Sequence, residues 1–250
     1  MANPNRPVVN AGLLYLNGLN ISNNATTPDE KIDVAVGAAR DSGNVNDIVL
    51  SEALTINCAV VGANGIDTGA LGNSLLYHVY IIGDSTLNQD VAGLVSLASN
   101  SSPSLPFGYD MYRRIGTVRT DGTADLLVFD QRGYGQEKIM WYQASIATDI
   151  TAGSSATFAA VDLSGSVPST ADVLIAKCSF TPTGADDPLE LRCGDSAVDE
   201  GQAIETGSAA GVVKKCNLWC PIGATIASGV DYKVTGSAVA INVQGYVDIL

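Results

Sequence analysis

The sequence predicts an all-β protein with a β-sandwich or jelly-roll-like architecture. Apolar residues recur with a period of two in short runs such as 13–21 and 32–38, which is the pattern of pleated strands. Clusters of turn-forming residues, among them 62–65 and 183–188, separate these runs. About a dozen short strands with turns throughout are typical of a sandwich, jelly roll or barrel. A helical period appears only at 88–99, where an edge strand fits equally well.

The expected strands share short length and an enrichment in β-branched residues, Leu and aromatic residues. Residues on both faces of the run 75–82 are mostly apolar, which predicts a strand covered on both sides. Asn64-Gly65 favours a tight hairpin turn because both residues tolerate a left-handed backbone. In chain order the expected strands are 13–21, 32–38, 54–61, 75–82, 111–119, 124–129, 138–145, 156–163, 173–180, 189–193, 209–216, 232–234 and 238–249.

A small and polar segment at 149–155 divides the chain into two parts of different composition. The upstream part carries most of the aromatic residues, whereas the downstream part is richer in Ala, Ser and Asp. We therefore expect an N-terminal tether at residues 1–11, a β-sandwich domain at 12–148 and a second, linked β lobe at 149–250.

The composition favours a subunit of an assembly. Only 16% of the 250 residues are charged, and Gly, Ala, Ser, Thr and Asn fill the deficit. A polar but uncharged surface suits faces that neighbouring subunits cover, because each buried charge needs a partner. We therefore expect the chain to associate with copies of itself.

Charge and hydropathy argue against several other classes of protein. The net charge of −13 disfavours binding to nucleic acid, because phosphates would repel the chain. No apolar run approaches the roughly 18 residues of a membrane span. The segment 1–7 also lacks the basic and apolar regions of a signal peptide. We therefore expect assembly in a cytoplasm without membrane insertion.

The five cysteines predict buried free thiols, because their number is odd and the expected compartment is reducing. The alternatives are a metal site built from Cys178, Cys193, Cys216 and Cys220, and a disulfide formed outside the cell. The spacing is too scattered for the paired knuckles of structural zinc. A disulfide would join Cys178 to Cys193 or Cys216 to Cys220.

The residue pattern predicts no enzyme and no cofactor. His78 is the only histidine and lies in mid-strand, where a structural role is expected instead of a catalytic triad. The acidic stretch supplies carboxylates that could cleave a glycan or bind Ca²⁺, but a solvated acidic loop explains it better. Its members are Asp186, Asp187, Glu190, Asp195, Asp199 and Glu200.

Two sets of residues are candidates for contact with partners. Arg113 and Arg114 follow each other in one strand and should point to opposite faces, where one pairs with Asp121, Asp125 or a carboxylate of a neighbouring subunit. A sugar-binding or protein-binding patch could comprise Tyr109, Tyr112, Tyr134, Trp141, Tyr142 and Trp219, although aromatic residues in strands more often belong to the core. The expected interface residues are Tyr112, Arg113, Arg114, Trp141 and Tyr142.

Five segments in the middle of the chain are similar to segments of a known protein family. They are 63–69, 77–83, 93–97, 105–109 and 112–122. Their order and spacing resemble a family of tailed-bacteriophage virion structural proteins, the β-rich proteins associated with tails and fibres. The resemblance implies a location in the virion and a homotrimeric knob or fibre component that contributes to host attachment. The implied partners are other virion proteins and a glycan or protein of the host surface.

Two alternatives accompany this hypothesis. The first strand begins near Leu13, so the tether is much shorter than the shaft of a free-standing fibre. This departure favours either a short knob docked on another protein or a capsid decoration protein that stabilises the shell. The second alternative belongs to a different functional class and is a glycan-degrading tail enzyme.

Overall fold

The computed structural model describes residues 15–98, 102–143, 148–184, 186–194, 203–206, 209–223, 229–234 and 238–250. Every regular element in these residues is a β-strand, which confirms the all-β prediction. All strand pairs are antiparallel except one between two short segments. The described ranges hold no helix with the length and apolar character needed to cross a membrane.

Two small sheets belong to the N-terminal part of the chain. A three-stranded sheet has the order β1 (Leu16–Gly18), β4 (Gly37–Arg40) and β5 (Asp47–Leu50). A four-stranded sheet has the order β10 (Met111–Arg119), β8 (Leu76–Gly83), β9 (Ala92–Ser96) and β7 (Gly65–Ile66).

A nine-stranded sheet joins the two halves of the chain. Its order is β18 (Lys214–Pro221), β15 (Ala171–Phe180), β20 (Val239–Ile249), β12 (Glu137–Tyr142), β11 (Phe129–Arg132), β2 (Ile21–Asn23), β3 (Lys31–Val34) and β6 (Leu54–Asn57), and β13 (Thr148–Gly153) also pairs with β20. The last sheet has the order β14 (Ala159–Val161), β19 (Val230–Val234), β16 (Pro188–Cys193) and β17 (Ala203–Thr206).

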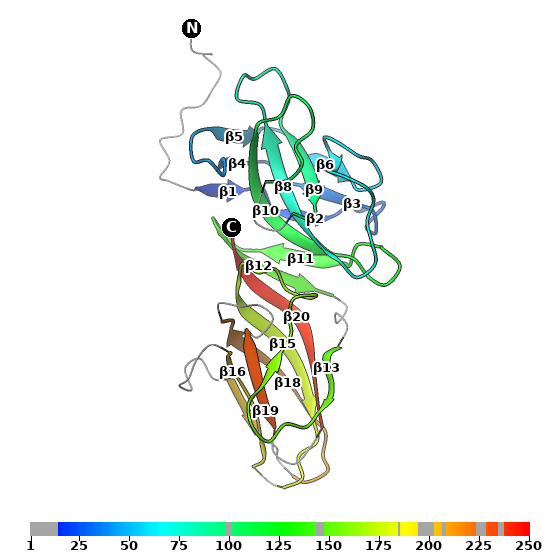
Figure 1. Cartoon of the computed structure of the whole chain (residues 1–250), viewed down its shortest axis with the longest axis vertical. Helices are drawn as coiled ribbons and strands as arrows, with labels where there is room; N and C mark the ends of the chain where they lie inside the picture. Colours follow the sequence, from blue (N-terminus) through cyan, green and yellow to red (C-terminus); the bar gives the residue numbers. More distant parts are fainter. Residues whose placement is uncertain are drawn as a thin grey trace.

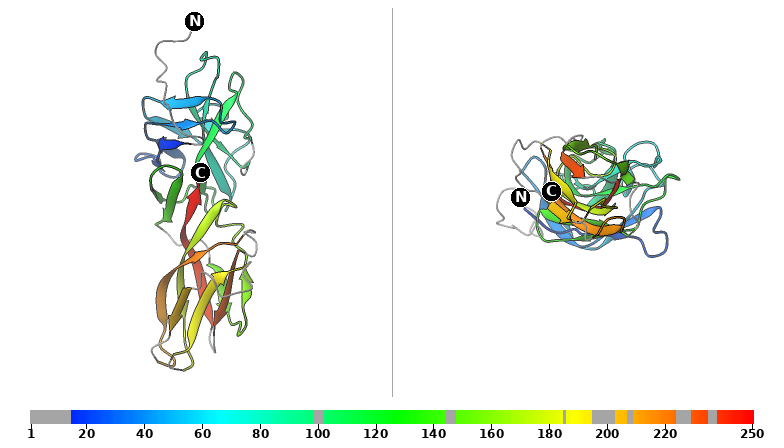
Figure 2. Two further views of the ribbon diagram at one scale, coloured as in Figure 1. Left: turned by 90° about the vertical axis from the view of Figure 1, so that its left-hand side faces the viewer. Right: turned by 90° about the horizontal axis from the view of Figure 1, so that it is seen from below.

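The molecule is elongated, with two lobes placed end to end (Figures 1 and 2). Strands β1 to β12 form one lobe and β13 to β19 lie in the other, so the chain changes lobe between Tyr142 and Thr148. Strand β20 starts in the second lobe and runs back to the first, where Gly245–Ile249 pairs with Glu137–Trp141 of β12. The C-terminal residues therefore belong to the joint between the lobes and not to the second lobe alone.

The expected strand 13–21 is divided between two sheets, and so is 32–38. Gly18 and Leu19 both have positive φ angles, of 70° and 54°, which turn the chain from β1 into β2. The chain also turns between β3 and β4, and this turn passes close to the turn between β1 and β2. A Cβ atom on Gly18 would lie 2.4 Å from the carbonyl oxygen of Val36. Glycine is therefore required at this position, and the corner lets one run of apolar residues serve two sheets.

Strand β8 is buried along both faces, as its sequence predicts. Tyr77, Val79 and Ile81 belong to the main core cluster, whereas Tyr80 and Ile82 belong to a second, smaller cluster. Half-buried Leu105, Tyr109 and Tyr112 pack against this second cluster. The chain thus covers both faces of β8 by itself, and this strand does not require a neighbouring subunit.

The segment 88–99 contains a strand and not a helix. Strand β9 lies between β8 and β7, so it is an inner strand of its sheet. A Cβ atom on Gly93 would lie 2.4 Å from two carbon atoms of the Ile56 side chain. The glycine that weakened the helical pattern therefore allows β6 to pack closely against β9.

Candidate functional site

The five expected interface residues lie in three different environments. Arg113, Arg114 and Tyr142 are buried inside the chain, and Tyr142 belongs to the main core. Tyr112 is half-buried and its ring meets Tyr80 edge to face at 6.0 Å between centroids. Trp141 is half-buried on the outside of the nine-stranded sheet. The structure therefore divides these residues between the joint of the two lobes and an outer surface.

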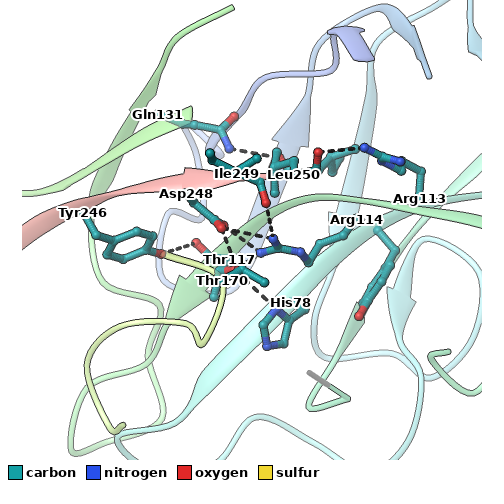
Figure 3. Close-up of polar contacts among 12 residues, drawn as sticks. His78, Arg113, Arg114, Thr117, Gln131, Thr170, Tyr246, Asp248, Ile249 and Leu250 are labelled. Carbon is teal, nitrogen blue, oxygen red and sulfur yellow. Dashed lines mark hydrogen bonds and ion pairs between the residues drawn. The ribbon is translucent and has the colours of Figure 1, made fainter. Parts of the chain in front are cut away.

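The joint is held by arginines of β10 that reach residues from the second half of the chain (Figure 3). Arg113 donates a hydrogen bond from Nη2 to the carbonyl oxygen of Leu250 at 2.7 Å. Arg119 donates from Nη1 to Oγ of Ser166 at 3.1 Å. Three buried cations on one strand, with Arg114 the third, thus fix the second lobe against the first.

Arg114 forms a bidentate ion pair with Asp248. Nη1 lies 2.7 Å from Oδ2 and Nη2 lies 3.0 Å from Oδ1 of the carboxylate. Nη2 also donates to the carbonyl oxygen of Ile249 at 3.1 Å, and the Thr170 hydroxyl donates to Asp248 at 2.7 Å. The expectation of pairing with Asp121, Asp125 or a neighbouring subunit is corrected, because β20 supplies the partner from within the same chain.

His78 completes the buried polar network. Its Nδ1 lies 3.3 Å from Oγ1 of Thr117, which also accepts a hydrogen bond from Arg114 at 3.2 Å. Burial, and then the positive charge of Arg114, lower the pKa of His78 to about 4, while Asp248 acts in the opposite direction. The imidazole is therefore neutral at pH 7, and Figure 3 shows it beside the arginine network.

The outer surface of the nine-stranded sheet is apolar around the joint. Two rows of residues, aligned by strand register, cross β12, β20, β15 and β18 on the face opposite the main core. We call this surface the apolar outer face. Its first row is Ile139, Val247, Val173 and Pro221, and its second row is Trp141, Gly245, Ile175 and Trp219.

Two tryptophans enclose the second row of the apolar outer face. The rings of Trp141 and Trp219 meet edge to face, with 5.9 Å between centroids and an interplanar angle of 65°. Ile175 lies between them in the row and is fully buried, although it lies outside the main core. Trp219 remains 47% exposed, which is unusual for the largest apolar side chain in proteins. The surface is thus only partly covered by the chain itself.

From the sequence we singled out the tryptophans of the apolar outer face but not its aliphatic residues. Trp141 and Trp219 were candidates for an aromatic patch, and the structure brings these two together. Tyr134 is almost fully exposed in the loop between β11 and β12. Tyr109 donates a hydrogen bond to the carbonyl oxygen of Asp90. The aliphatic members of the face could have been found from the continuous apolar run 173–176, because such runs mark strands covered on both sides.

Two described carboxylates of the acidic stretch, Asp187 and Glu190, have structural partners. Asp187 accepts hydrogen bonds from the backbone of Thr183 and Gly184 and from the Thr183 hydroxyl, and these bonds lower the pKa of Asp187. A glycosidase acid needs the opposite shift at neutral pH. Glu190 pairs with Lys233 at 2.7 Å. Asp195, Asp199 and Glu200 lie outside the described residues.

A cleft of about 710 Å³ lies between the β5–β6 turn and the loop that follows β8. Four carboxylates line it, from Asp47, Glu52, Asp84 and Asp90. Asp84 accepts hydrogen bonds from backbone amides of its own loop, and Asp47 pairs with Arg40 at 2.6 Å. These two carboxylates therefore hold the walls of the cleft in place.

Cys58, Cys178, Cys216 and Cys220 are free thiols in the part of the chain that the structure describes. Cys216 and Cys220 lie four residues apart on one strand, which separates their Cα atoms by about 13 Å and prevents a disulfide between them. The side chain of Cys193 lies outside the described residues. Among the side chains that are described, no group of three or more His, Cys, Asp or Glu is placed to hold a metal ion.

Comparison with known proteins returned no family model that matches the chain and no curated protein that is significantly similar to it. Inferences about function therefore depend on the geometry of this chain and on the resemblance described above.

Proposed function

We propose that the protein is a non-catalytic structural component of a tailed-phage virion, a tail-associated knob or fibre subunit that contributes to host attachment. It assembles with copies of itself, as a trimer, and docks on other virion proteins. The apolar outer face is the observation that carries the assembly part of this proposal. The resemblance in segments 63–122 carries the virion part.

The chemistry of the apolar outer face supports a role in protein contact. Partly exposed tryptophans beside aliphatic side chains are enriched in protein interfaces, because burial of an aromatic ring contributes more than burial of most other side chains. The polar row that follows it, Lys177 with Asn217 and Asn242, gives the surface a hydrophilic rim. An apolar centre with a polar border is the usual anatomy of an interface.

The joint between the lobes also fits a structural role in a virion. A particle component must transmit force between its attachment point and its exposed end. Here the joint combines strand pairing between β12 and β20 with buried arginine bonds to the last residues of the chain. The two lobes are thereby connected by more than the single chain segment between β12 and β13.

Localisation on purified particles tests the virion role directly. An antibody against the folded protein should label the tail of intact particles in electron micrographs, and a reconstruction should fit the two-lobed chain into tail density. Labelling of the head shell would instead support the capsid decoration alternative. Particles that contain none of the protein would contradict a virion role altogether.

An oligosaccharide-release assay on host surface glycans separates attachment from cleavage. We expect the purified protein to release no sugar, because Asp187 holds a turn and Glu190 forms an ion pair. Sugar release that depends on Glu190 or Asp187 would identify the glycan-degrading enzyme as the correct alternative.

A further inference from the structure

Two cysteines lie opposite each other on neighbouring strands of the nine-stranded sheet. Cys178 of β15 and Cys216 of β18 are direct partners in the antiparallel register. Direct partners have Cα atoms about 4.5–5.5 Å apart, which is within the range of disulfide-bonded cysteines. Both side chains point to the core side of the sheet, where Cys178 is a member of the main cluster and Cys216 packs against it.

The two thiols differ in access and in acidity. Cys178 is buried, whereas Cys216 is half-buried on β18, which is the last strand at its end of the sheet. The interaction between the two thiols lowers the pKa of Cys216 and raises the pKa of Cys178, which burial raises further. Lys214 lowers the pKa of Cys216 further, while burial and the negative charge of Glu205 oppose the shift. Cys216 is thus the more reactive thiol of the pair.

We propose that Cys178 and Cys216 form a reversible cross-strand disulfide when the folded protein meets a peroxide. The Cys216 thiolate attacks one oxygen of hydrogen peroxide, so that an S–O bond forms, the O–O bond breaks and water leaves after protonation. The Cys178 sulfur then attacks the sulfenic sulfur, so that the S–S bond forms, the S–O bond breaks and the hydroxide leaves as a second water with the thiol proton of Cys178. The peroxide is reduced by two electrons and the thiol pair is oxidised by two. This inference is independent of the proposed virion role.

The disulfide would attach the last strand of the sheet covalently to its neighbour. Strand β18 carries Trp219 and Pro221 of the apolar outer face, and its pairing with β15 covers Val173–Phe180. A cross-link near one end of this pairing restrains the strand against fraying at the edge. A thiol reductant reverses the reaction by exchange.

Thiol counting on the folded protein tests the proposal. After treatment with dilute hydrogen peroxide, the protein is unfolded in the presence of N-ethylmaleimide and weighed as an intact chain. We expect three of the five cysteines to be alkylated, against all five before oxidation, with full recovery after dithiothreitol. The oxidised protein should remain a single chain on a non-reducing gel in denaturant.

Site-specific variants identify the bond. Cys58→Ser and Cys220→Ser should still lose two thiols on oxidation, whereas Cys216→Ser should lose none. Trypsin leaves Cys216 and Cys220 in one peptide, so the linked peptide is mapped in Cys220→Ser, where it should join 178–192 to 216–233. Cys216 is half-buried, so its substitution by serine preserves the fold and keeps the test decisive.

Three results would overturn the proposal. The first is loss of two thiols on oxidation in Cys216→Ser. The second is that Cys178 and Cys216 both remain free thiols after oxidation in Cys220→Ser. The third is oxidation of Cys216 in the wild type to a sulfinic or sulfonic acid without a linked peptide. Each would show that the register of Cys178 and Cys216 does not lead to a bond.

Discussion

His78 shows how burial removes the charge of a single residue. Its pKa is lowered to about 4 because the ring is buried and faces Arg114, although Asp248 partly offsets this effect. The unfolded chain, with a histidine pKa near 6.5, therefore binds a proton that the folded chain does not bind between about pH 6.5 and 4. The free energy of unfolding should fall by about 3 kcal/mol as the pH is lowered through this window.

Urea unfolding of the wild type and of His78→Gln at several pH values measures this contribution. The variant lacks the titrating ring, so its stability should decline less steeply between pH 6.5 and 4. Carboxylates elsewhere in the chain contribute equally to both proteins and cancel in the difference. Parallel curves for the two proteins would show that the proton affinity of His78 is the same in the folded and unfolded chain.

A second prediction at the residue scale concerns the ion pair between Arg114 and Asp248. Asp248→Asn keeps the shape of the side chain but leaves the Arg114 guanidinium buried beside a neutral amide. Removal of one partner of a buried pair costs about 3–5 kcal/mol, which chemical denaturation should detect as a lower midpoint.

The exposed pair between Arg132 and Asp130 provides the matched control for Asp248→Asn. Its nitrogen and oxygen atoms lie 2.6 Å apart, but the Arg132 side chain is 72% exposed. Arg132→Ala should therefore change the free energy of unfolding by less than about 1 kcal/mol. Similar losses in the two variants would mean that burial of the Arg114 pair has no energetic consequence.

At the scale of the element, strand β20 depends on a close approach to β12. A Cβ atom on Gly245 would lie 2.1 Å from the carbonyl oxygen of Met140, so Gly245→Ala forces the two backbones apart. We expect a loss of about 1–3 kcal/mol in the free energy of unfolding, the usual cost of overpacking. Hydrogen exchange of β12 amides should become faster, because the pairing between the lobes is weakened.

Gly122→Ala is the control for Gly245→Ala. A Cβ atom at Gly122 would have no neighbour within 4 Å, so alanine fits there without displacing any atom. Its effect should be neutral or slightly stabilising, because alanine reduces the conformational entropy of the unfolded chain. Gly245→Ala with unchanged stability and unchanged exchange in β12 would contradict the proposed tight joint.

At the scale of the whole molecule, the apolar outer face predicts self-association. The wild type should form an oligomer at micromolar concentration, with the trimer as the specific expectation, in light scattering coupled to gel filtration. Trp219→Glu places a charge among Trp141, Ile175 and Pro221, so the variant should shift to the monomer. Its free energy of unfolding should fall by about 1–3 kcal/mol, because the half-buried ring and its edge-to-face contact with Trp141 are lost.

Tyr134→Glu provides the comparison for Trp219→Glu. Tyr134 is 97% exposed and lies on a loop apart from the apolar outer face, so its substitution should leave the oligomer intact. A wild-type protein that remains monomeric at micromolar concentration would contradict self-association. Equal dissociation of both variants would place the interface elsewhere on the molecule.

The elements themselves could be predicted from local pattern. The all-β class and the coverage of β8 on both faces follow from the spacing of apolar residues, because a pleated strand directs successive side chains to opposite faces. Trp141 and Trp219 could also be singled out, because large aromatic rings dominate the energetics of contact surfaces. These features depend on residues within a few positions of one another along the chain.

Only the tertiary structure decided what these features contact. In sequence, Arg113 and Arg114 resemble two surface cations, but their partners lie 134 or more residues away, in the last strand and the residue that follows it. The sharing of runs 13–21 and 32–38 between two sheets likewise depends on the crossing of Gly18 with Val36. Local alternation determines which face of a strand is apolar, whereas strand pairing depends on the burial and hydrogen bonding of the whole chain. The sequence by itself therefore determined strands and faces, and tertiary packing decided that β20 joins the lobes and aligns the apolar outer face.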